Sequence, residues 1–226
     1  MGHTQRTIQT YNLIADRYHV VATPEHRAWL EDSMRDFFGR LPGPAILVAA
    51  CGEGRDSRYF RDLGARVVSF DLSEGMLEVA RSSDPEGTYF RADLRDVQSI
   101  DLQFDGIWAC ACLYHLTKQE FRICLRTFFQ MLRPRGILFL NLKLGTGERF
   151  IDVPREGYPG GEIARELVGS RFYAFYTRDE LSEYFSDFTV EKERRDLLKE
   201  GDGAMEFWLK KQQATLGMAF PIDTGF

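Results

Sequence analysis

Residues at the ends of two apolar runs have types and a spacing that could bind a ligand. The run 45–50 leads into Gly52-Glu53-Gly54, and the run 67–70 ends in Asp71. In a strand–helix–strand unit, glycines let the backbone approach a ligand closely. A carboxylate after the second strand can accept the protons of two ribose hydroxyls. This spacing predicts that the chain binds a compound containing a nucleoside.

Features that the loop lacks narrow the class of ligand. A dinucleotide-binding loop carries a third glycine where this chain has Ser57, and no Gly-Lys-Ser/Thr triplet of a phosphate loop follows. Glu53 adds a negative charge where a pyrophosphate would need unopposed amide donors. A nucleoside without phosphates therefore fits the loop better.

The stretch from Ile46 to Lys143 resembles the class I S-adenosylmethionine-dependent methyltransferases. The loop itself, the segments 71–77 and 91–94, and the strand and loop at 104–116 carry the resemblance. It implies S-adenosyl-L-methionine as the cofactor and S-adenosyl-L-homocysteine as the product. The acceptor would be a small molecule methylated at oxygen, nitrogen or sulfur. The implied cofactor-binding residues are Tyr11, Tyr18, Ala49, Ala50, Cys51, Gly52, Glu53, Gly54, Arg55, Asp71, Leu72, Ser73, Met76, Ala92, Asp93, Leu94, Ala109, Cys110 and His115.

The resemblance assigns roles at the nucleoside end of the cofactor. Asp71 would hold the ribose hydroxyls, Leu72 and Met76 would pack on the adenine, and Asp93 would receive the adenine amino group. Ser73 would also cap the helix that follows.

Residues 1–40 are expected to form helices that cover the cofactor. Tyr11 or Tyr18 would close over the methionine carboxylate, although packing of this helix on the sheet is an equally good reading. Arg55 could meet the same carboxylate, or simply begin a helix.

One position departs from the family's pattern. The first strand of these proteins usually carries Asp or Glu where this chain has Val48, and that acid helps to organise the loop and the cofactor's ammonium group. Its loss could weaken cofactor binding by about 1–3 kcal/mol, the scale of a charged hydrogen bond. Glu53 or Asp56 could supply the missing charge.

Catalysis is expected to need mainly alignment, because a sulfonium already activates the methyl group. A base is needed only if the acceptor must lose a proton, and His115 is the first candidate because its pKa can lie near neutrality. A purely structural histidine is an equally good reading. The second choices are Tyr114, Lys143, Tyr173 and Tyr176.

The segment 145–176 is rich in glycine and proline and is longer than most connections. It would follow the carboxyl end of a parallel strand, where ligands bind in this architecture, and it is predicted to be a substrate lid. Within it, 171–176 would form either an edge strand or an aromatic pocket in which Arg171 pairs with an acidic substrate group.

Apolar runs and amphipathic segments alternate along the chain, which favours an α/β fold. We predict a Rossmann-like, doubly wound, mostly parallel sheet of seven strands, the last one antiparallel, with helices on both faces, in a single domain of residues 1–226. The expected strands are 45–49, 66–71, 88–90, 106–110, 136–143, 188–195 and 204–211. The expected helices are 4–18, 25–38, 55–63, 73–81, 118–132 and 177–185.

Composition points the same way. A net charge of −5 with scattered basic residues disfavours a nucleic-acid partner. No signal segment or membrane-spanning run is visible, and the four cysteines suggest reduced thiols in the cytoplasm rather than disulfides. Their spacing does not suit a metal site. A monomer or a homodimer is expected.

Two other functions stay open at this stage. Val48 and the nearby cysteines could belong to a fold that keeps the cofactor but catalyses isomerisation or cyclisation. A non-catalytic protein that binds the cofactor or its product is the third hypothesis.

Overall fold

The computed structural model describes residues 2–20, 24–97, 102–154, 167–196 and 203–212. The elements in chain order are α1 (His3–Ile14), η1 (Ala15–Val20), α2 (Pro24–Arg40), β1 (Ala45–Ala49), α3 (Arg55–Asp62), β2 (Arg66–Asp71), α4 (Glu74–Ser83), β3 (Thr88–Arg91), β4 (Phe104–Ala109), η3 (Leu113–His115), α5 (Lys118–Met131), β5 (Leu132–Leu144), β6 (Glu148–Pro154), β7 (Leu167–Tyr176), α6 (Arg178–Tyr184), β8 (Phe188–Asp196) and β9 (Ala204–Lys211).

The predicted mostly parallel sheet is confirmed. β3, β2, β1, β4 and β5 lie side by side and parallel. β9 then pairs with β5 in the antiparallel direction, and β8 pairs with β9. These are the seven predicted strands, with the last one in the chain antiparallel. The expected boundaries shift most at β5, which begins at Leu132 because a register irregularity lets it pair with Phe104 before the turn at Arg135.

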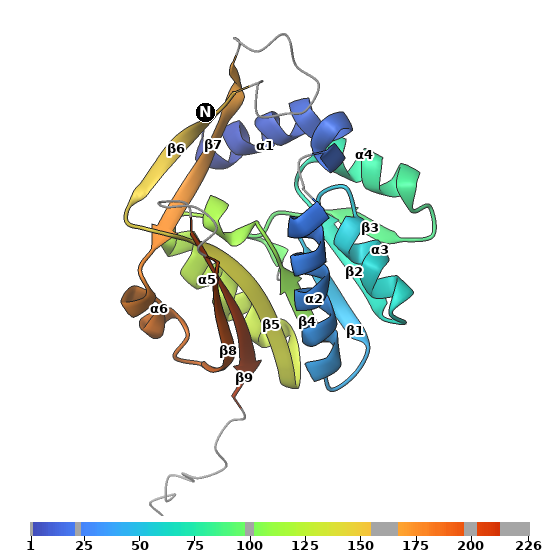
Figure 1. The fold of residues 1–226 in the computed structure, drawn as a ribbon, viewed down its shortest axis with the longest axis vertical. Coiled ribbons are helices and arrows are strands. Elements are labelled where there is room, and N and C mark those ends of the chain that lie inside the picture. Colours follow the sequence, from blue (N-terminus) through green and yellow to red (C-terminus); the bar gives the residue numbers. More distant parts are fainter. Residues whose placement is uncertain (1, 21–23, 98–101, 155–166, 197–202, 213–226) are drawn as a thin grey trace, which may run out of the picture.

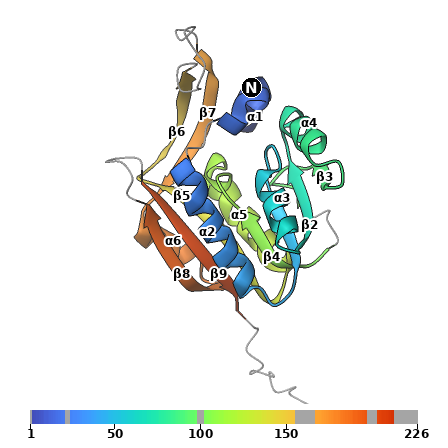
Figure 2. The same ribbon diagram turned by 45° about the vertical axis from the view of Figure 1, so that its right-hand side comes forward.

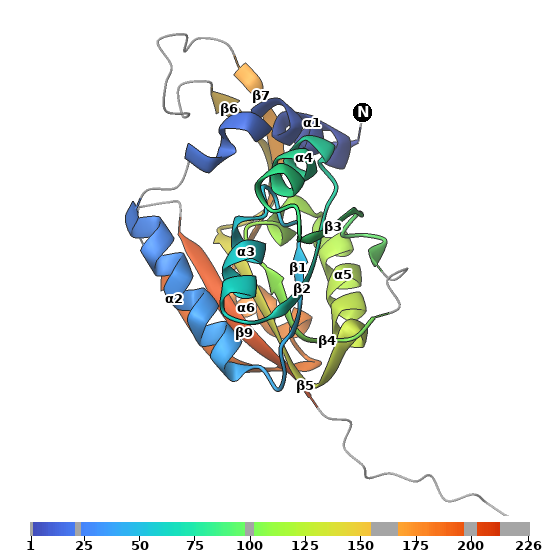
Figure 3. The same ribbon diagram turned by 90° about the vertical axis from the view of Figure 1, so that its right-hand side faces the viewer.

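Helices cover both faces of the sheet (Figure 3). Successive side chains of a strand point to opposite faces, so the buried strand β1 serves two cores. Leu47 packs with residues of α5 and α6, whereas Ile46 and Val48 pack with residues of α2 and α3. The core on the α2 side is rich in aromatic rings. The ring centroids of Phe37 and Trp108 are 5.2 Å apart, and Trp108 stacks on Phe139 with 3.8 Å between their ring centroids.

Two helix starts follow directly from sequence. Ser73 caps α4 as predicted, because its hydroxyl accepts the N–H of Met76 at 3.2 Å. Thr117 and Glu120 form a capping box at the start of α5. The predicted first helix is regular only as far as Ile14 and continues as the 3₁₀ segment η1.

The β6–β7 hairpin is an addition to the predicted sheet (Figures 1 and 2). It joins the rest through two residue pairs, Lys143 with Phe175 and Leu144 with Tyr176. Residues 171–176 therefore form a strand, as one of the two alternatives predicted, but this strand lies between β5 and β6 rather than at the edge, and the edge strand β6 was not predicted. Phe150 and Ile151 are about 40% exposed, so β6 lacks the buried, alternating face from which a strand is usually recognised. The remainder of the predicted lid, 155–166, lies outside the described residues.

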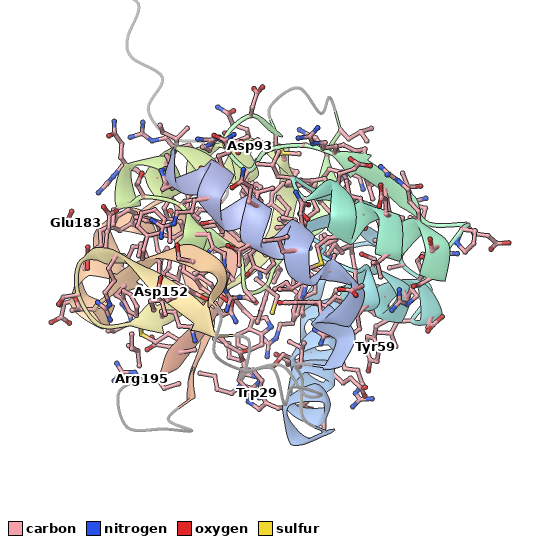
Figure 4. The ribbon with its side chains drawn as sticks, turned by 90° about the horizontal axis from the view of Figure 1, so that it is seen from above. Trp29, Tyr59, Asp93, Asp152, Glu183 and Arg195 are labelled. Carbon is pink, nitrogen blue, oxygen red and sulfur yellow. The ribbon has the colours of Figure 1, made fainter. Side chains whose placement is uncertain are left out.

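Helix α1 crosses the carboxyl ends of the parallel strands, with the β6–β7 hairpin on one side and α4 on the other (Figure 4). On the hairpin side, the Thr10 hydroxyl donates to the carbonyl of Ser170 at 3.0 Å. On the α4 side, the Asn12 side-chain oxygen accepts the Gly75 N–H at 3.1 Å. In contrast, α2, the other predicted cofactor-covering helix, packs on the face of the sheet through Leu30, Met34 and Phe37. In the described part of the chain, no helix is long and apolar enough to cross a bilayer.

We expect Phe37→Ala to lower the free energy of unfolding by about 3–5 kcal/mol, the usual cost of truncating a fully buried phenylalanine. Phe37 is 0% exposed and contacts three aromatic rings. Phe150→Ala is the matched control, since 41% of that residue is exposed, and should cost about 1 kcal/mol or less. Urea denaturation of both variants measures the difference. Equal losses would mean that the α2 core does not carry the stability assigned to it.

Candidate functional site

A pocket of about 990 Å³, its open mouth included, lies between α1 and the carboxyl ends of β1, β2 and β4. The predicted cofactor residues that line it are Tyr11, Tyr18, Ala50, Cys51, Gly52, Glu53, Arg55, Asp71, Leu72, Met76, Ala92, Asp93, Leu94, Cys110 and His115. Ala49, Gly54, Ser73 and Ala109 lie behind this wall. The structure thus gathers most of the predicted set at one place.

The loop after β1 is bent by left-handed backbone. Ala50, Gly52 and Gly54 have φ angles of 49°, 55° and 78°. The two glycines serve different purposes. A Cβ on Gly52 would meet no atom within 4 Å, which leaves this backbone open to a ligand, whereas a Cβ on Gly54 would lie 2.7 Å from the Tyr89 hydroxyl. Ala50 adopts a conformation that is unfavourable for residues with a Cβ.

Asp71 connects this loop to the end of β2. One carboxylate oxygen accepts the Gly52 N–H and the other accepts the Ser73 N–H, both at 2.8 Å. Burial raises the pKa of Asp71 above its ordinary value, although these backbone N–H groups act in the opposite direction. A carboxylate has about four acceptor positions, so Asp71 can hold the loop and still accept protons from a ligand.

Beyond Asp71 the pocket wall is mostly apolar. Leu72, Met76, Leu94 and Leu116 contribute to it. Asp93 lies at this end and accepts the backbone N–H and the Nε of Arg95, each at 2.9 Å. Burial alone would raise the pKa of Asp93, but the hydrogen bonds from Arg95 more than offset it and lower the pKa. Asp93 is therefore an ionised acceptor in this part of the pocket.

Helix α1 adds pocket residues that were not predicted. Thr4, Thr7 and Ile8 line the pocket together with Tyr11. Their spacing of i, i+3, i+4 and i+7 places them on one face of a helix. This periodicity was present in the sequence. It was not recognised as a binding face because threonines and apolar residues are mixed on it.

His115 is fixed between two hydrogen bonds. Its Nδ1 lies 2.6 Å from the carbonyl oxygen of Phe172, and its Nε2 lies 2.8 Å from the Tyr11 hydroxyl. A carbonyl oxygen can only accept, so Nδ1 carries the proton and Nε2 accepts the proton of Tyr11. The Tyr11 oxygen in turn accepts a hydrogen bond from Arg171 at 3.1 Å.

The surroundings of His115 keep its ring neutral. The ring faces the pocket but is enclosed by protein, and this desolvation is the main reason that its pKa falls to about 3. The Phe172 carbonyl opposes the fall, while the positive charges of Arg171 and Lys143 add to it. At neutral pH, His115 is therefore a hydrogen-bond acceptor with little basicity.

Three of the four alternative catalytic residues surround His115. The Tyr173 ring lies 4.7 Å from His115 and stacks on Tyr114 at 5.4 Å, and the Lys143 Nζ lies 5.9 Å from the centre of the Tyr114 ring. Burial raises the pKa of Tyr114 well above its ordinary value, which disfavours a phenolate. Tyr176 lies elsewhere.

Tyr176 belongs to the core between β7, α5 and α6. Its ring is fully buried and lies 5.2 Å from Phe121 and 6.0 Å from Tyr184. Tyr173 and Tyr176 are an odd number of residues apart in one strand, so their side chains leave opposite faces. The prediction that both could serve the same site therefore does not fit the geometry.

The pocket thiols are poor nucleophiles. Burial raises the pKa of Cys110 well above its ordinary value, and Asp56 raises it further. Burial and Asp71 act on Cys51 in the same way. Protonated thiols are weakly reactive. Among the residues that the structure describes, no three His, Cys, Asp or Glu side chains converge as metal ligands would.

We expect ¹⁵N NMR to find His115 neutral, with its proton on Nδ1, from pH 5 to pH 8. Because its folded pKa of about 3 lies below its ordinary value of 6.5, the unfolded chain takes up this proton first as the pH falls. The stability that His115 contributes is therefore present above pH 6.5 and is lost as the pH falls toward 3. Tyr11→Phe should shift the Nε2 resonance alone. A His115 resonance that titrates near pH 6.5 would contradict the assignment.

Comparison with known proteins agrees with this geometry. A family model described as a methyltransferase domain matches residues 46–136, from β1 to the start of β5. The malonyl-acyl-carrier-protein O-methyltransferase of Enterobacter lignolyticus is 32% identical over 117 residues, which are 50% of this chain and 46% of that protein. The matched part thus spans less than half the length of such curated relatives.

Two solved structures resemble most of the chain in fold. The CcbJ methyltransferase of Streptomyces caelestis has a TM-score of 0.71 at 16% identity and covers 91% of this chain and 99% of its own. The glycopeptide N-methyltransferase MtfA, solved with S-adenosylmethionine, has a TM-score of 0.63 at 17% identity and covers 84% of this chain and 98% of its own. Residues 46–136 are therefore similar to a methyltransferase domain, and the chain has the fold of these two methyltransferases.

Proposed function

We propose that this protein transfers a methyl group from S-adenosyl-L-methionine to an oxygen, nitrogen or sulfur atom of a small molecule. The observation that carries the proposal is the Asp71 carboxylate, which holds the glycine loop of β1 and faces a pocket roofed by α1. The family model and the O-methyltransferase relative support the same reaction class.

The chemistry of the pocket fits this cofactor. The Asp71 carboxylate suits a ribose diol, and the open backbone at Gly52 suits close approach of the ligand. The apolar wall formed by Leu72, Met76 and Leu94 suits a purine ring, with the acceptor Asp93 at its edge. When bound, the cofactor would supply a methyl group activated by a positively charged sulfur, so that the sulfur keeps the bonding electrons on transfer.

The protein then has to align the acceptor and exclude water. Helix α1 covers the pocket and is held by Thr10 to the hairpin and by Asn12 to α4. His115, held in its Nδ1-protonated form by the Phe172 carbonyl, orients the hydroxyl of Tyr11. We assign His115 to this orienting role in place of the predicted role of base, because a group with a pKa of about 3 is a weak proton acceptor.

The charges around His115 favour an acceptor that arrives as an anion. Arg171 and Lys143 both place positive charge at this point, among the rings of Tyr11, Tyr114 and Tyr173. An anionic acceptor already offers an electron pair, so no base is required. We therefore propose an ionised acceptor group, such as a carboxylate, which the positive charges of Arg171 and Lys143 would attract.

Other features of the protein's context follow as part of the same proposal. The described cysteines are free thiols, which suits the cytoplasm. A small-molecule acceptor, rather than a nucleic acid, suits the net charge of −5. We expect a monomer or a homodimer.

Incubation of the protein with S-adenosyl-L-methionine and fractionated metabolites tests the reaction. A methyltransferase forms S-adenosyl-L-homocysteine in step with a methylated product, and both are measured by mass spectrometry. Carboxylate acceptors should be preferred over their carboxamides. Cofactor binding without this product, across acidic, neutral and basic fractions, would favour the alternatives of isomerisation, cyclisation or sensing.

We expect Asp71→Asn to weaken the binding of S-adenosyl-L-methionine by about 1.5–3 kcal/mol, the scale of hydrogen bonds to a charged group. The reason is that Asp71 would both accept the ribose protons and hold the Gly52 N–H. Calorimetric titration measures the loss, with Asp62→Asn, an exposed aspartate of α3, as the control. Unchanged affinity in a folded Asp71→Asn protein would refute the ribose assignment.

A further inference from the structure

A pair of opposite charges lies in the pocket wall at the start of α3. The Arg55 Nε donates to one carboxylate oxygen of Asp56 at 2.9 Å, and the Arg55 Nη2 lies 2.8 Å from the same oxygen. Both residues line the pocket, with 37% of the Arg55 side chain and 12% of the Asp56 side chain exposed. The charges therefore face whatever fills this part of the pocket.

Asp56 is held in place from the sheet as well. The indole N–H of Trp108 donates to its other carboxylate oxygen at 2.8 Å. Trp108 is fully buried in β4, and its Cα is paired with that of Val48 in β1. The Asp56 carboxylate is thus hydrogen-bonded to Trp108, the residue that lies beside Val48 in the sheet, and Val48 is the position where an acid was expected.

Val48 itself leaves no room for a charge. It is 1% exposed and packs in the apolar cluster of Phe37 and Phe60. An unpaired carboxylate at this position would be costly to bury. The negative charge that this strand lacks is instead available from α3, a few residues further along the chain.

The chemistry of the pair matches one part of the proposed cofactor. The methionine portion carries an ammonium and a carboxylate on the same carbon, so a cation and an anion held side by side are complementary to it. The Asp56 oxygen that accepts from Trp108 retains acceptor capacity, whereas the other oxygen is already contacted by two Arg55 nitrogens. Arg55 has five N–H donors and uses some of them on Asp56.

We propose that Asp56 binds the α-ammonium group of the cofactor and that Arg55 binds its α-carboxylate, so that Asp56 does the work of the acid absent at Val48. This inference rests on the proposed function. It also explains how a chain that has Val48 in place of an acid could still recognise the charges of the cofactor's methionine portion.

Glu53 is the other pocket carboxylate that could do this. It also lines the pocket, but none of the described side chains donates a hydrogen bond to its carboxylate. Asp56 is fixed by two partners, so less conformational freedom is lost when it binds a ligand. Glu53→Gln therefore tests the competing assignment.

Calorimetric titration with two ligands tests the assignment. S-adenosyl-L-homocysteine carries the amino-acid portion, whereas 5′-methylthioadenosine keeps the nucleoside and the sulfur but lacks that portion. We expect Asp56→Asn to weaken S-adenosyl-L-homocysteine binding at least tenfold and to change 5′-methylthioadenosine binding less than twofold. Glu53→Gln should weaken S-adenosyl-L-homocysteine binding less than Asp56→Asn does. Asp62→Asn, at an exposed aspartate of the same helix, is the control and should leave the affinities for both ligands nearly unchanged.

The other outcomes are equally informative. Equal losses for both ligands, no loss for S-adenosyl-L-homocysteine, or a larger selective loss in Glu53→Gln than in Asp56→Asn would each overturn the role of Asp56. If Asp56→Asn does not fold, Arg55→Gln provides the same comparison, and it too should weaken S-adenosyl-L-homocysteine selectively. Failure of the unmodified protein to bind either ligand would refute the proposed function itself, which is a different result from any of these.

Discussion

The contact between the Asp71 carboxylate and the backbone N–H groups of Gly52 and Ser73 is the interaction on which the rest of the site depends. It connects the loop after β1 to the end of β2 and to the first turn of α4. A buried carboxylate needs such partners, because burial without hydrogen bonds is costly. The same geometry leaves the Gly52 backbone open and aims the carboxylate into the pocket. The side chain that holds the loop is thus the one proposed to recognise the ligand.

A second constraint comes from the roof. Helix α1 has few apolar residues of its own to bury, and it is held by hydrogen bonds to both of its supports, the hairpin at Ser170 and α4 at Gly75. The hydroxyl of Tyr11, which belongs to α1, is hydrogen-bonded to His115. Desolvation and two nearby cations keep that histidine neutral. Its Nε2 can therefore accept the hydrogen bond of Tyr11 while its Nδ1 donates to the Phe172 carbonyl. The proposed anionic acceptor would need no base, and a neutral His115 is a weak base.

Much of the fold could be predicted because local signals and burial agree. The strand β1 is an unbroken apolar run, and parallel strands buried on both faces have this composition. Ser73 and Thr117 have the side chains that cap helices, and both do so. The hairpin strand β6 escaped prediction because Phe150 and Ile151 are largely exposed, so its pattern resembles that of a loop. Its pairing with β7 is settled by contacts that no local window contains.

For the site, the sequence by itself determined the loop and the terminal carboxylate of β2, since these follow from spacing along one strand–helix–strand unit, and the resemblance to methyltransferases added the apolar wall. Three other features were decided only by the tertiary structure. The protonation of His115 depends on the carbonyl of Phe172, which lies in the distant hairpin. The separation of Tyr176 from Tyr173 depends on which face of β7 meets the core. The position of Asp56 depends on the indole of Trp108. Each is a contact between residues far apart in the chain, and the physical reason is the same: charge and hydrogen bonding are set by neighbours in space.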